Sequence, residues 1–413
     1  MISTRNRELL NLVVVAILIG IGFTSVYVAQ KAVFDSKSLS YGVFFLAVFI
    51  AAHLVNRFTV PWADPYLLPM AGLLAALGFT EIYRLDQHDA GRQGLWIVLG
   101  VLVYGVTLIT LRRDYRVLES YKYLFGLGAI LLLVLPAVPG IGATVNGARL
   151  WVRIGSFQFQ PGELAKIFLI VFLAGYLREK REVLAQGRLK DFGPLLVIWG
   201  GAMLVLVQTN DLGSALLYFG VFLAMVYAAT GRALYAAIGA VLFVGGAAAA
   251  YTMIPRIQDR VAIWLDPWSR AQDEGYQPVQ ATYSIAEGGF GGTGLGKGSF
   301  TLPGGADIIP ELNTDFIFAA LAQELGLIGI SGLILVYMLF TLRGFRIALL
   351  AAGLTFVFAL QTFIIVGGVL RVIPLTGITL PFVSYGGSSV VSNFVMLALL
   401  LLVSHRAVRT APT

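Results

Sequence analysis

Residues 9–30 read LLNLVVVAILIGIGFTSVYVAQ, an uncharged apolar run that decides the class of fold. A helix rises 1.5 Å per residue, so this run is long enough to cross about 30 Å of hydrocarbon. Eleven further largely apolar runs follow, at about 41–56, 66–83, 93–111, 121–138, 163–177, 192–208, 211–229, 233–251, 314–340, 346–366 and 386–404. We therefore expect an all-α polytopic membrane protein with about twelve transmembrane helices.

Composition excludes several other classes of protein. Hydrophobic residues make up 58% of the chain and charged residues 12%. The apolar runs are continuous, whereas the strands of a membrane β-barrel alternate in polarity. The absence of Cys excludes disulfides, thiol catalysis and thiolate metal sites. His53, His88 and His405 are scattered, which argues against a His-rich metal cluster.

The distribution of Lys and Arg predicts the orientation in the membrane. If the amino terminus is cytoplasmic, seventeen of the 29 Lys and Arg lie in inner connections and eleven in outer ones, while Lys166 lies inside a span. The dense clusters at 112–116 and 178–190 both fall inside. We expect both termini in the cytoplasm. The net charge of +7 then reflects topology and contact with anionic membrane lipids, so no nucleic acid is needed as a partner.

The longest polar passage of the chain runs from Thr252 to Phe318, with a loop expected at about 252–313. The orientation above makes this loop extracellular. Loops of such length are uncommon unless they are functional or disordered, and the Trp and Tyr content here argues against disorder. We therefore look for function in this loop and in Asp315, which stands where it meets the next apolar run.

Two glycine patterns within this loop resemble nucleotide-binding motifs only by letter. Residues 291–298 read GGTGLGKG, one residue short of a P-loop, and Gly298 occupies the Ser/Thr position that would hold magnesium. Residues 289–294 match the dinucleotide fingerprint without a βαβ context. An outward-facing loop is also remote from cytoplasmic ATP. A tight, adaptable loop whose glycines permit close packing is the simpler interpretation.

Three groups of polar residues interrupt the apolar pattern. Glu163 and Lys166 are three apart and share a helix face, either as a buried functional pair or as an interface pair that snorkels. Asp315 is either an outward-facing base or an acid favoured by a helix start. Residues 371–389, RVIPLTGITLPFVSYGGSS, contain several helix-disrupting residues and must be buried in protein or line a cavity, unless they form a mere outer connection.

Several segments together resemble the SEDS family (shape, elongation, division and sporulation), whose members include RodA and FtsW. They occur in family order over about residues 64–404, and jointly they are highly specific. The segments are 146–151 (NGARLW), 160–163 (QPGE), 211–213 (DLG), 264–267 (WLDP), 275–277 (GYQ), 310–318 (PELNTDFIF), 324–326 (ELG) and 374–388.

The resemblance implies a ten-helix core over residues 61–413, to which residues 1–60 add an N-terminal transmembrane hairpin. It implies a peptidoglycan glycosyltransferase of the bacterial cytoplasmic membrane that polymerises lipid II on the outer face, beside a class B penicillin-binding protein. Asp315 matches the family's catalytic carboxylate. Residues expected at the substrate are Glu163, Lys166, Arg149, Asn146, Gln277, Asp211, Ser384, Gly386 and Ser388. The family also implies a divalent cation, Mg²⁺ or Mn²⁺, for which no spacing of carboxylates defines a site.

The expected chemistry needs a base for the acceptor hydroxyl and positive charge for the departing pyrophosphate. As a hypothesis, Asp315 takes the proton, while Arg149, Lys166 or a bound cation offsets the charge of the donor lipid. Two other functions stay open at this point. A lipid II flippase would use the polar intramembrane residues as a passage, and a scaffold of the elongation or division machinery would use only its outer helix surfaces.

The expected orientation can be tested by cysteine labelling, because the chain has no Cys of its own. A single Cys in place of Ser299 should react in intact cells with a maleimide that does not cross membranes. A single Cys in place of Ala185 should react only after the cells are opened. Reversed labelling would contradict the orientation.

Overall fold

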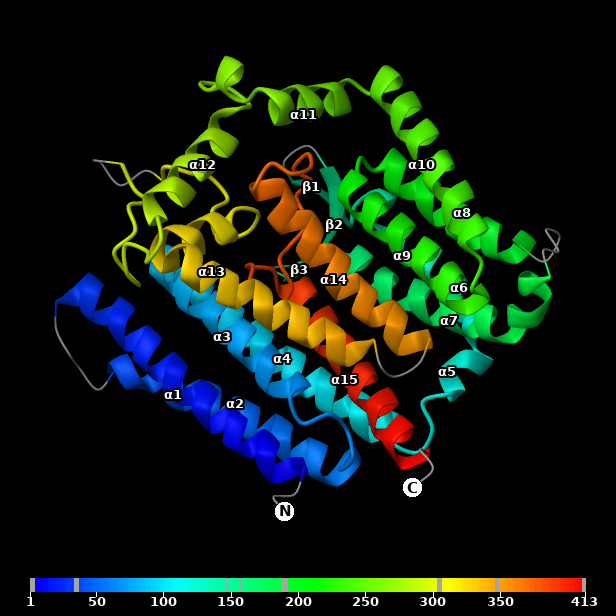
Figure 1. The fold of residues 1–413 in the computed structure, drawn as a ribbon, viewed down its shortest axis with the longest axis horizontal. Coiled ribbons are helices and arrows are strands. Elements are labelled where there is room, and N and C mark those ends of the chain that lie inside the picture. Colours follow the sequence, from blue (N-terminus) through cyan, green and yellow to red (C-terminus); the bar gives the residue numbers. More distant parts are fainter. Residues whose placement is uncertain are drawn as a thin grey trace.

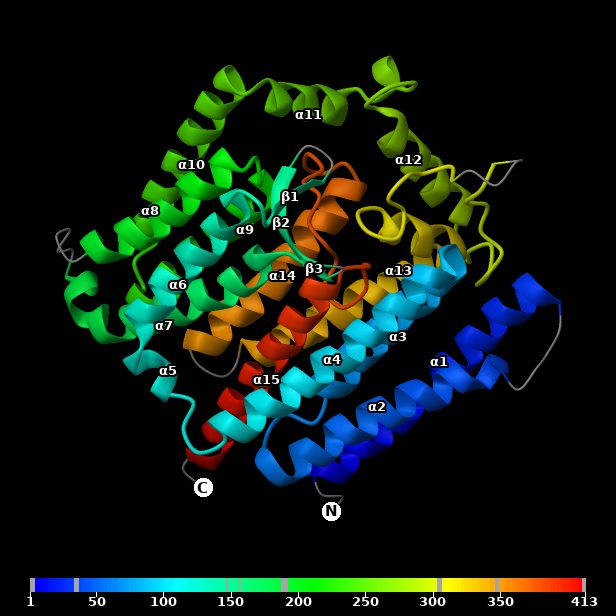
Figure 2. The same cartoon turned by 180° about the vertical axis from the view of Figure 1, so that it is seen from behind.

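The computed structural model describes residues 4–32, 37–145, 148–155, 157–186, 192–302, 307–345 and 349–410. Long helices dominate it, and both chain ends lie on one side of the bundle (Figures 1 and 2). The helices that coincide with the expected spans are α1 (Thr4–Lys31), α2 (Lys37–Thr59), α3 (Leu67–Leu85), α4 (Gln87–Leu111), α6 (Lys122–Val134), α7 (Pro161–Ala185), α8 (Gly193–Gln208), α9 (Leu212–Thr230), α10 (Ala233–Met253), α13 (Ile317–Gly344), α14 (Leu349–Val369) and α15 (Gly387–Thr410).

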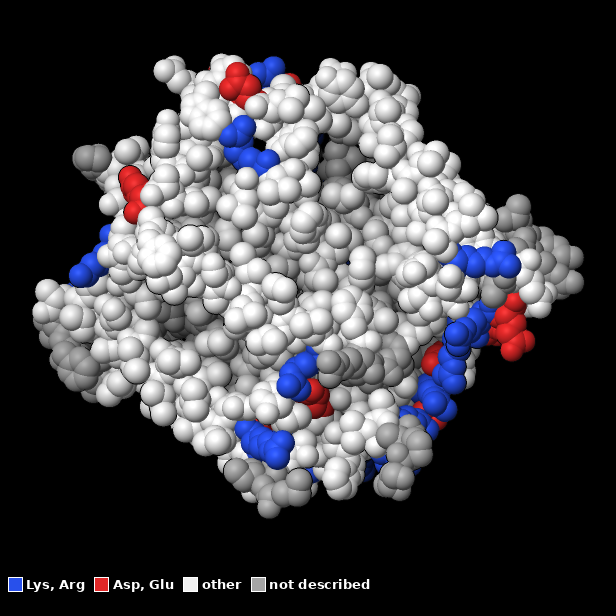
Figure 3. Space-filling view, viewed as in Figure 1, with Lys and Arg blue, Asp and Glu red and all other residues white. Residues whose placement is uncertain are grey.

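Length and composition make eight of these helices able to cross a membrane, within the described residues: α1, α2, α4, α9, α10, α13, α14 and α15. Two more, α6 and α8, belong to shorter apolar segments. The multi-pass helical membrane fold is therefore confirmed, and the count of twelve spans stays a prediction. Figure 3 agrees with this placement, because charged side chains gather toward the side of the termini and, in smaller groups, near α11 and α12, leaving a broad face without them.

A small antiparallel sheet between α6 and α7 is an addition that the sequence did not predict. Its strands are β1 (Gly142–Val145), β2 (Ala148–Ile154) and β3 (Phe157–Phe159), in the order β1-β2-β3. Val152 pairs with Gly142 on one side and with Phe159 on the other. Strands this short give too brief an alternation to be distinguished from a loop in sequence. Short helical pieces, α5 (Val117–Ser120) and η1 (Leu135–Ala137), flank α6.

The expected loop at 252–313 contains helices of its own. They are α11 (Pro255–Leu265), η3 (Trp268–Arg270) and α12 (Tyr276–Gly288). Pro255 occupies the first turn of α11, where its missing N–H costs nothing. Figure 1 shows α11 bridging the space between α10 and α12, on the side of the bundle opposite the termini. Up to Gly288, this passage therefore forms a helical roof rather than an irregular loop.

Residues 370–386 lie between α14 and α15 and contain neither helix nor strand. They pass through the interior of the bundle, where Leu380, Phe382 and Val383 are buried. Phe382 stacks on Phe358 of α14, with ring centroids 5.6 Å apart. The expected break in the helical pattern at 371–389 is therefore confirmed up to residue 386, while residues 387–389 already belong to α15, and several apolar side chains of the break belong to the core.

The N-terminal hairpin, α1 and α2, packs against α3 through aromatic side chains. Phe23 lies 4.4 Å from Tyr41 and 4.7 Å from Tyr83, measured between ring centroids, and Tyr41 lies 5.3 Å from Phe79. A buried ion pair joins Arg5 to Glu8 near the chain start. The hairpin is firmly attached, and the division into residues 1–60 and 61–413 stays a prediction.

Candidate active site

A cleft of about 1040 Å³ opens beneath α11 and contains Asp315. Its walls come from α4, the sheet, the turn between α8 and α9, α11, the turn before α13 and the non-helical residues after α14. The polar residues that line it include Arg92, Arg153, Gln158, Gln160, Asn210, Asp211, Arg256, Arg260, Glu311, Thr314, Asp315, Thr376, Thr379, Tyr385, Ser388 and Ser389. Segments far apart in sequence therefore meet at one polar cavity.

Asp315 lies in the turn that leads into α13, two residues before the helix begins. Its N–H donates to the Glu311 carbonyl at 3.1 Å. A Cβ added at Gly377, which has a φ of +73°, would lie 3.4 Å from the Asp315 carboxylate, so the chain opposite approaches closely. Burial, together with the nearby Glu311, raises the pKa of Asp315 to about 6, and the charge of Arg260 opposes this rise. The carboxylate is thus poised to exchange a proton near neutral pH.

Four arginines line the same cleft as this carboxylate. Arg256 and Arg260 stand one turn apart on α11, and the side chain of Arg260 donates to the Thr376 carbonyl at 3.3 Å. Arg92 and Arg153 line the cleft from α4 and β2. These four positive side chains outnumber the three carboxylates of the lining, Asp211, Glu311 and Asp315. The cleft therefore suits an anionic ligand that brings a proton-donating group to Asp315.

Hydrogen bonds tie the non-helical segment to the turn that carries Asp315. Ser384 Oγ accepts from Leu380 N–H at 2.9 Å and donates to the Thr314 carbonyl at 2.7 Å. Tyr385 N–H donates to the Asn313 carbonyl at 2.9 Å. From α4, Gln93 donates to the Ser384 carbonyl at 3.2 Å. Ser384 is therefore buried support behind Asp315 and does not line the cleft.

Glu163 and Lys166 form the expected pair on α7. Their charged groups are 2.9 Å apart, and Lys166 is only 3% exposed. Lys166 also donates to Gln361 Oε1 at 3.1 Å, and Gln361 in turn donates to the Thr379 carbonyl at 2.8 Å. Such burial argues against a snorkelling interface pair. Neither charge lines the cleft, but the chain of contacts ends at Thr379, which does.

The remaining residues expected at the substrate divide into two groups. Asp211 caps α9 by accepting from Ser214 N–H at 3.0 Å, and it lines the cleft together with Gly386 and Ser388. Arg149 and Gln277 do not line it, and their expected place at the substrate stays a prediction. Arg149 is exposed and directed to the Val138 carbonyl, at 3.4 Å. The Gln277 side chain donates to the Pro310 carbonyl at 3.3 Å. Asn146 lies outside the described residues.

Sequence reasoning missed the arginines of α11 and the support from Gln93. The signal for the arginines was present, since Arg256 and Arg260 are four apart just after Pro255 and so share a helix face. Gln93 gave no comparable signal, because a lone Gln near the start of an apolar run is ordinary.

The glycine-rich loop, residues 289–298, clasps α13 where that helix is interrupted at Gly326, which has a φ of +64°. Thr293 N–H donates to the Gln323 carbonyl at 2.9 Å. The Glu324 carboxylate accepts from Gly296 N–H at 2.7 Å and from Gly298 N–H at 3.1 Å. These amides bind a protein carboxylate, so the loop serves to hold α13 and has no P-loop role.

A double-mutant cycle on protein stability tests the Glu163–Lys166 pair. Removing one partner leaves a buried charge alone, so Glu163→Gln and Lys166→Met should each destabilise the fold by about 3 kcal/mol or more. The double variant should lose clearly less than the sum. Thermal unfolding in detergent measures this coupling. The exposed pair Arg270–Asp259 is the matched control, for which Arg270→Met and Asp259→Asn should be nearly additive. Additivity at the buried pair would contradict its coupling.

Comparison with known proteins finds relatives along nearly the whole chain. The RodA peptidoglycan glycosyltransferase of Mycobacterium tuberculosis H37Rv is 39% identical over 443 aligned positions, covering 99% of this chain and 93% of the relative. That alignment extends through the N-terminal hairpin. A probable FtsW peptidoglycan glycosyltransferase of Geobacter sp. strain M18 is 34% identical, covering 83% of this chain and 97% of the relative.

Solved structures show the same fold. A chain from a peptidoglycan synthase complex that coordinates polymerization and crosslinking is 29% identical, with a TM-score of 0.69, and covers 84% of this chain and 99% of its own length. The rod shape determining protein RodA of Thermus thermophilus is 27% identical, with a TM-score of 0.62, and the match covers 84% of this chain and 97% of the RodA chain. The family model described as cell cycle protein, for FtsW, RodA and SpoVE, matches residues 58–409. This chain therefore belongs to the FtsW/RodA/SpoVE family.

Proposed function

We propose that this protein is a peptidoglycan glycosyltransferase that polymerises lipid II into glycan strands on the outer face of the cytoplasmic membrane. The observation that carries the proposal is Asp315, a carboxyl whose pKa is raised to about 6, inside a cleft bordered by arginines. The names of its relatives support the reaction, since both RodA and FtsW are named peptidoglycan glycosyltransferases.

The reaction joins the 4-hydroxyl oxygen of an acceptor sugar to the anomeric carbon of the donor and breaks the bond from that carbon to the lipid pyrophosphate. Asp315 takes the proton of the attacking hydroxyl. A base with a pKa near 6 is ionised at neutral pH and remains basic enough to accept that proton in the transition state. The turn before α13, fixed through Ser384 and Tyr385, holds the carboxylate in place.

Positive charge for the departing pyrophosphate comes from α11 in this proposal. Arg149 and Lys166 were the expected sources, but neither lines the cleft. Arg256 and Arg260 line the cleft together, from α11. The charge of Arg260 also lowers the pKa of Asp315. A planar guanidinium can bind two phosphate oxygens at once. Glu163 and Lys166 act as positioning residues, because their contacts reach the cleft only through Gln361 and Thr379.

The proposal includes a divalent cation that the protein holds through few ligands of its own. No group of three or more His, Cys, Asp and Glu in the described part of the chain is arranged to hold a metal. Mg²⁺ commonly binds one or two carboxylates and takes its other ligands from substrate phosphates and water. Glu311, which lines the cleft beside Asp315, fits that requirement with one carboxylate and would hold the ion, leaving Asp315 as the base. When bound, it would offset negative charge on the pyrophosphate.

The proposed setting follows the charge pattern and the family. Both termini face the cytoplasm, with the cleft outside, and a class B penicillin-binding protein crosslinks the product during cell elongation or division. The solved complex among the structural relatives couples polymerization with crosslinking and supports such a partner. A flippase would need a passage through the bundle, whereas hydrogen bonds from Ser384, Tyr385 and Gln93 close the cleft behind Asp315.

Substitution of Asp315 tests the proposed base. Asp315→Asn removes the proton acceptor at nearly constant size, so polymer formation from lipid II should fall by about 10²–10⁴-fold. Asp315→Glu tests proton geometry, since it keeps the charge and moves it by one methylene group. Asp266→Asn, at the exposed C-cap of α11, is a matched control that should leave activity unchanged. Near-normal polymer from Asp315→Asn would overturn the assignment.

The Asp315→Asn variant should be at least as stable as the wild type at pH 7. Folding raises the pKa of Asp315 from about 4 in the unfolded chain to about 6. The folded state therefore binds this proton more tightly, which stabilises the fold at pH values below about 4. That stabilisation is lost as the pH rises through about 6. Asn carries no such penalty at neutral pH. A melting temperature measured at pH 5 and pH 7 checks this, and a large loss of stability at pH 7 would show that any lost activity reflects misfolding.

The pH profile gives an independent test of the proposed base. The kcat/KM for polymerisation should rise with pH, reach half of its maximum at about pH 6 and level off above pH 7. Arg260→Gln removes a charge that lowers this pKa, so its midpoint should move to higher pH. A profile that is flat between pH 5 and pH 8, or a midpoint unmoved in Arg260→Gln, would contradict the role given to Asp315.

A further inference from the structure

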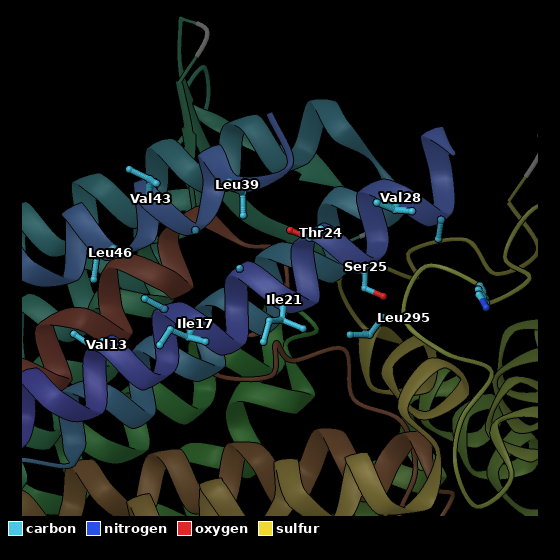
Figure 4. Close-up of a pocket in the computed structure, with 15 residues that line it drawn as sticks. Val13, Ile17, Ile21, Thr24, Ser25, Val28, Leu39, Val43, Leu46 and Leu295 are labelled. Atoms are coloured by element: carbon cyan, nitrogen blue, oxygen red, sulfur yellow. The ribbon is translucent and has the colours of Figure 1, made fainter. Parts of the chain in front are cut away.

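A second cavity, of about 900 Å³, lies outside the cleft, on the surface of the N-terminal hairpin. We call it the hairpin groove. Figure 4 shows it running along α1 from Val13 to Val28, with Leu39, Val43 and Leu46 of α2 and Leu295 of the glycine-rich loop beside it. Its lining is almost wholly apolar, with Thr24, Ser25 and Lys297 as the exceptions.

The groove is longer than one leaflet is deep, so its outer part can hold a full lipid acyl chain. Val13 and Val28 are separated by a helix rise of roughly 22 Å, while one leaflet of hydrocarbon is about 15 Å deep. The groove begins about a third of the way along α1 (Thr4–Lys31), at Val13, and ends at the glycine-rich loop. That end is the one remote from the chain terminus, and therefore lies on the side of the active-site cleft (Figure 1).

Two lysines stand at this outer end. Lys297 lines the groove, and Lys31 follows Val28 by three residues and so lies on the same face of α1. Both side chains are exposed. No salt bridge of the described residues involves either of them. An apolar channel that ends at two cations complements a molecule with a hydrocarbon chain and a negative head group.

We propose that the hairpin groove binds an anionic glycerophospholipid of the outer leaflet, with an acyl chain along α1 and α2 and its phosphate between Lys31 and Lys297. The site borders the loop that clasps α13. A Cβ at Gly296 would lie 2.8 Å from Ala29 Cβ, so the loop and α1 are in close contact. A lipid held here stabilises the outer side of this loop, whose inner side holds Glu324.

Native mass spectrometry of the full-length protein in detergent tests the site with two added lipids of identical acyl chains, phosphatidylglycerol and phosphatidylcholine. A lysine near an anionic surface contributes about a fivefold gain in binding, so one tightly bound phosphatidylglycerol should be preferred by roughly 25-fold. The pair Lys31→Gln with Lys297→Gln should bring this preference close to parity.

A groove-filling variant completes the experiment. A Cβ added at Gly20 would meet nothing within 4 Å, so the side chain of Gly20→Leu can extend into the groove. This variant should weaken the binding of both lipids at least tenfold. Gly246→Leu, at an equally open position on α10, is the matched control and should bind like the wild type. The surface lysine variants keep the test informative if Gly20→Leu does not fold.

Three outcomes would overturn the proposal. The first is equal retention of phosphatidylglycerol and phosphatidylcholine by the wild type. The second is equal lipid binding by Gly20→Leu and Gly246→Leu. The third is displacement of phosphatidylglycerol by undecaprenyl phosphate at equal concentration. The last would assign the groove to a polyprenyl lipid. None of these measurements uses polymerisation, so failure of this inference leaves the proposed function untouched.

Discussion

The non-helical backbone of residues 370–386 is the constraint on which the site depends. A chain without helix or strand cannot leave its N–H and C=O groups unsatisfied inside a membrane protein, so other elements must supply partners. Gln93 from α4, Gln361 from α14 and the hydroxyl of Ser384 do so, and Tyr385 N–H bonds the turn before α13. The bonds that satisfy this segment also fix the position of Asp315.

The same constraint explains why buried charges remain in the bundle. Lys166 is held by Glu163 and reaches the non-helical segment through Gln361. A buried ion pair contributes little net stability, but the loss of one partner is costly. From the other side, Arg371 donates to the Trp264 carbonyl at 3.0 Å, and the Trp264 indole donates to the Arg371 carbonyl at 2.9 Å. These bonds place α11, with its arginines, over the cleft.

Local sequence patterns predicted much of this arrangement. Continuous apolar runs indicated the helices, the Pro and Gly of residues 371–389 indicated the break, and the three-residue spacing of Glu163 and Lys166 indicated their pairing. Residues that depend on packing between distant segments were harder to predict. Arg149 was expected at the substrate, but its strand directs it to Val138. The arginines of α11 were seen only as loop charges, because their role depends on how α11 lies over the cleft.

We propose that this cleft polymerises lipid II and does not carry it across the membrane. The most direct measurement uses the purified wild-type protein in liposomes, supplied with lipid II on the side of the cleft. Glycan polymer and lipid translocation are assayed in parallel on the same vesicles. We expect polymer without translocation. Translocation without polymer would identify a flippase, and neither activity in correctly folded protein would favour a scaffold, so either result would contradict this proposal.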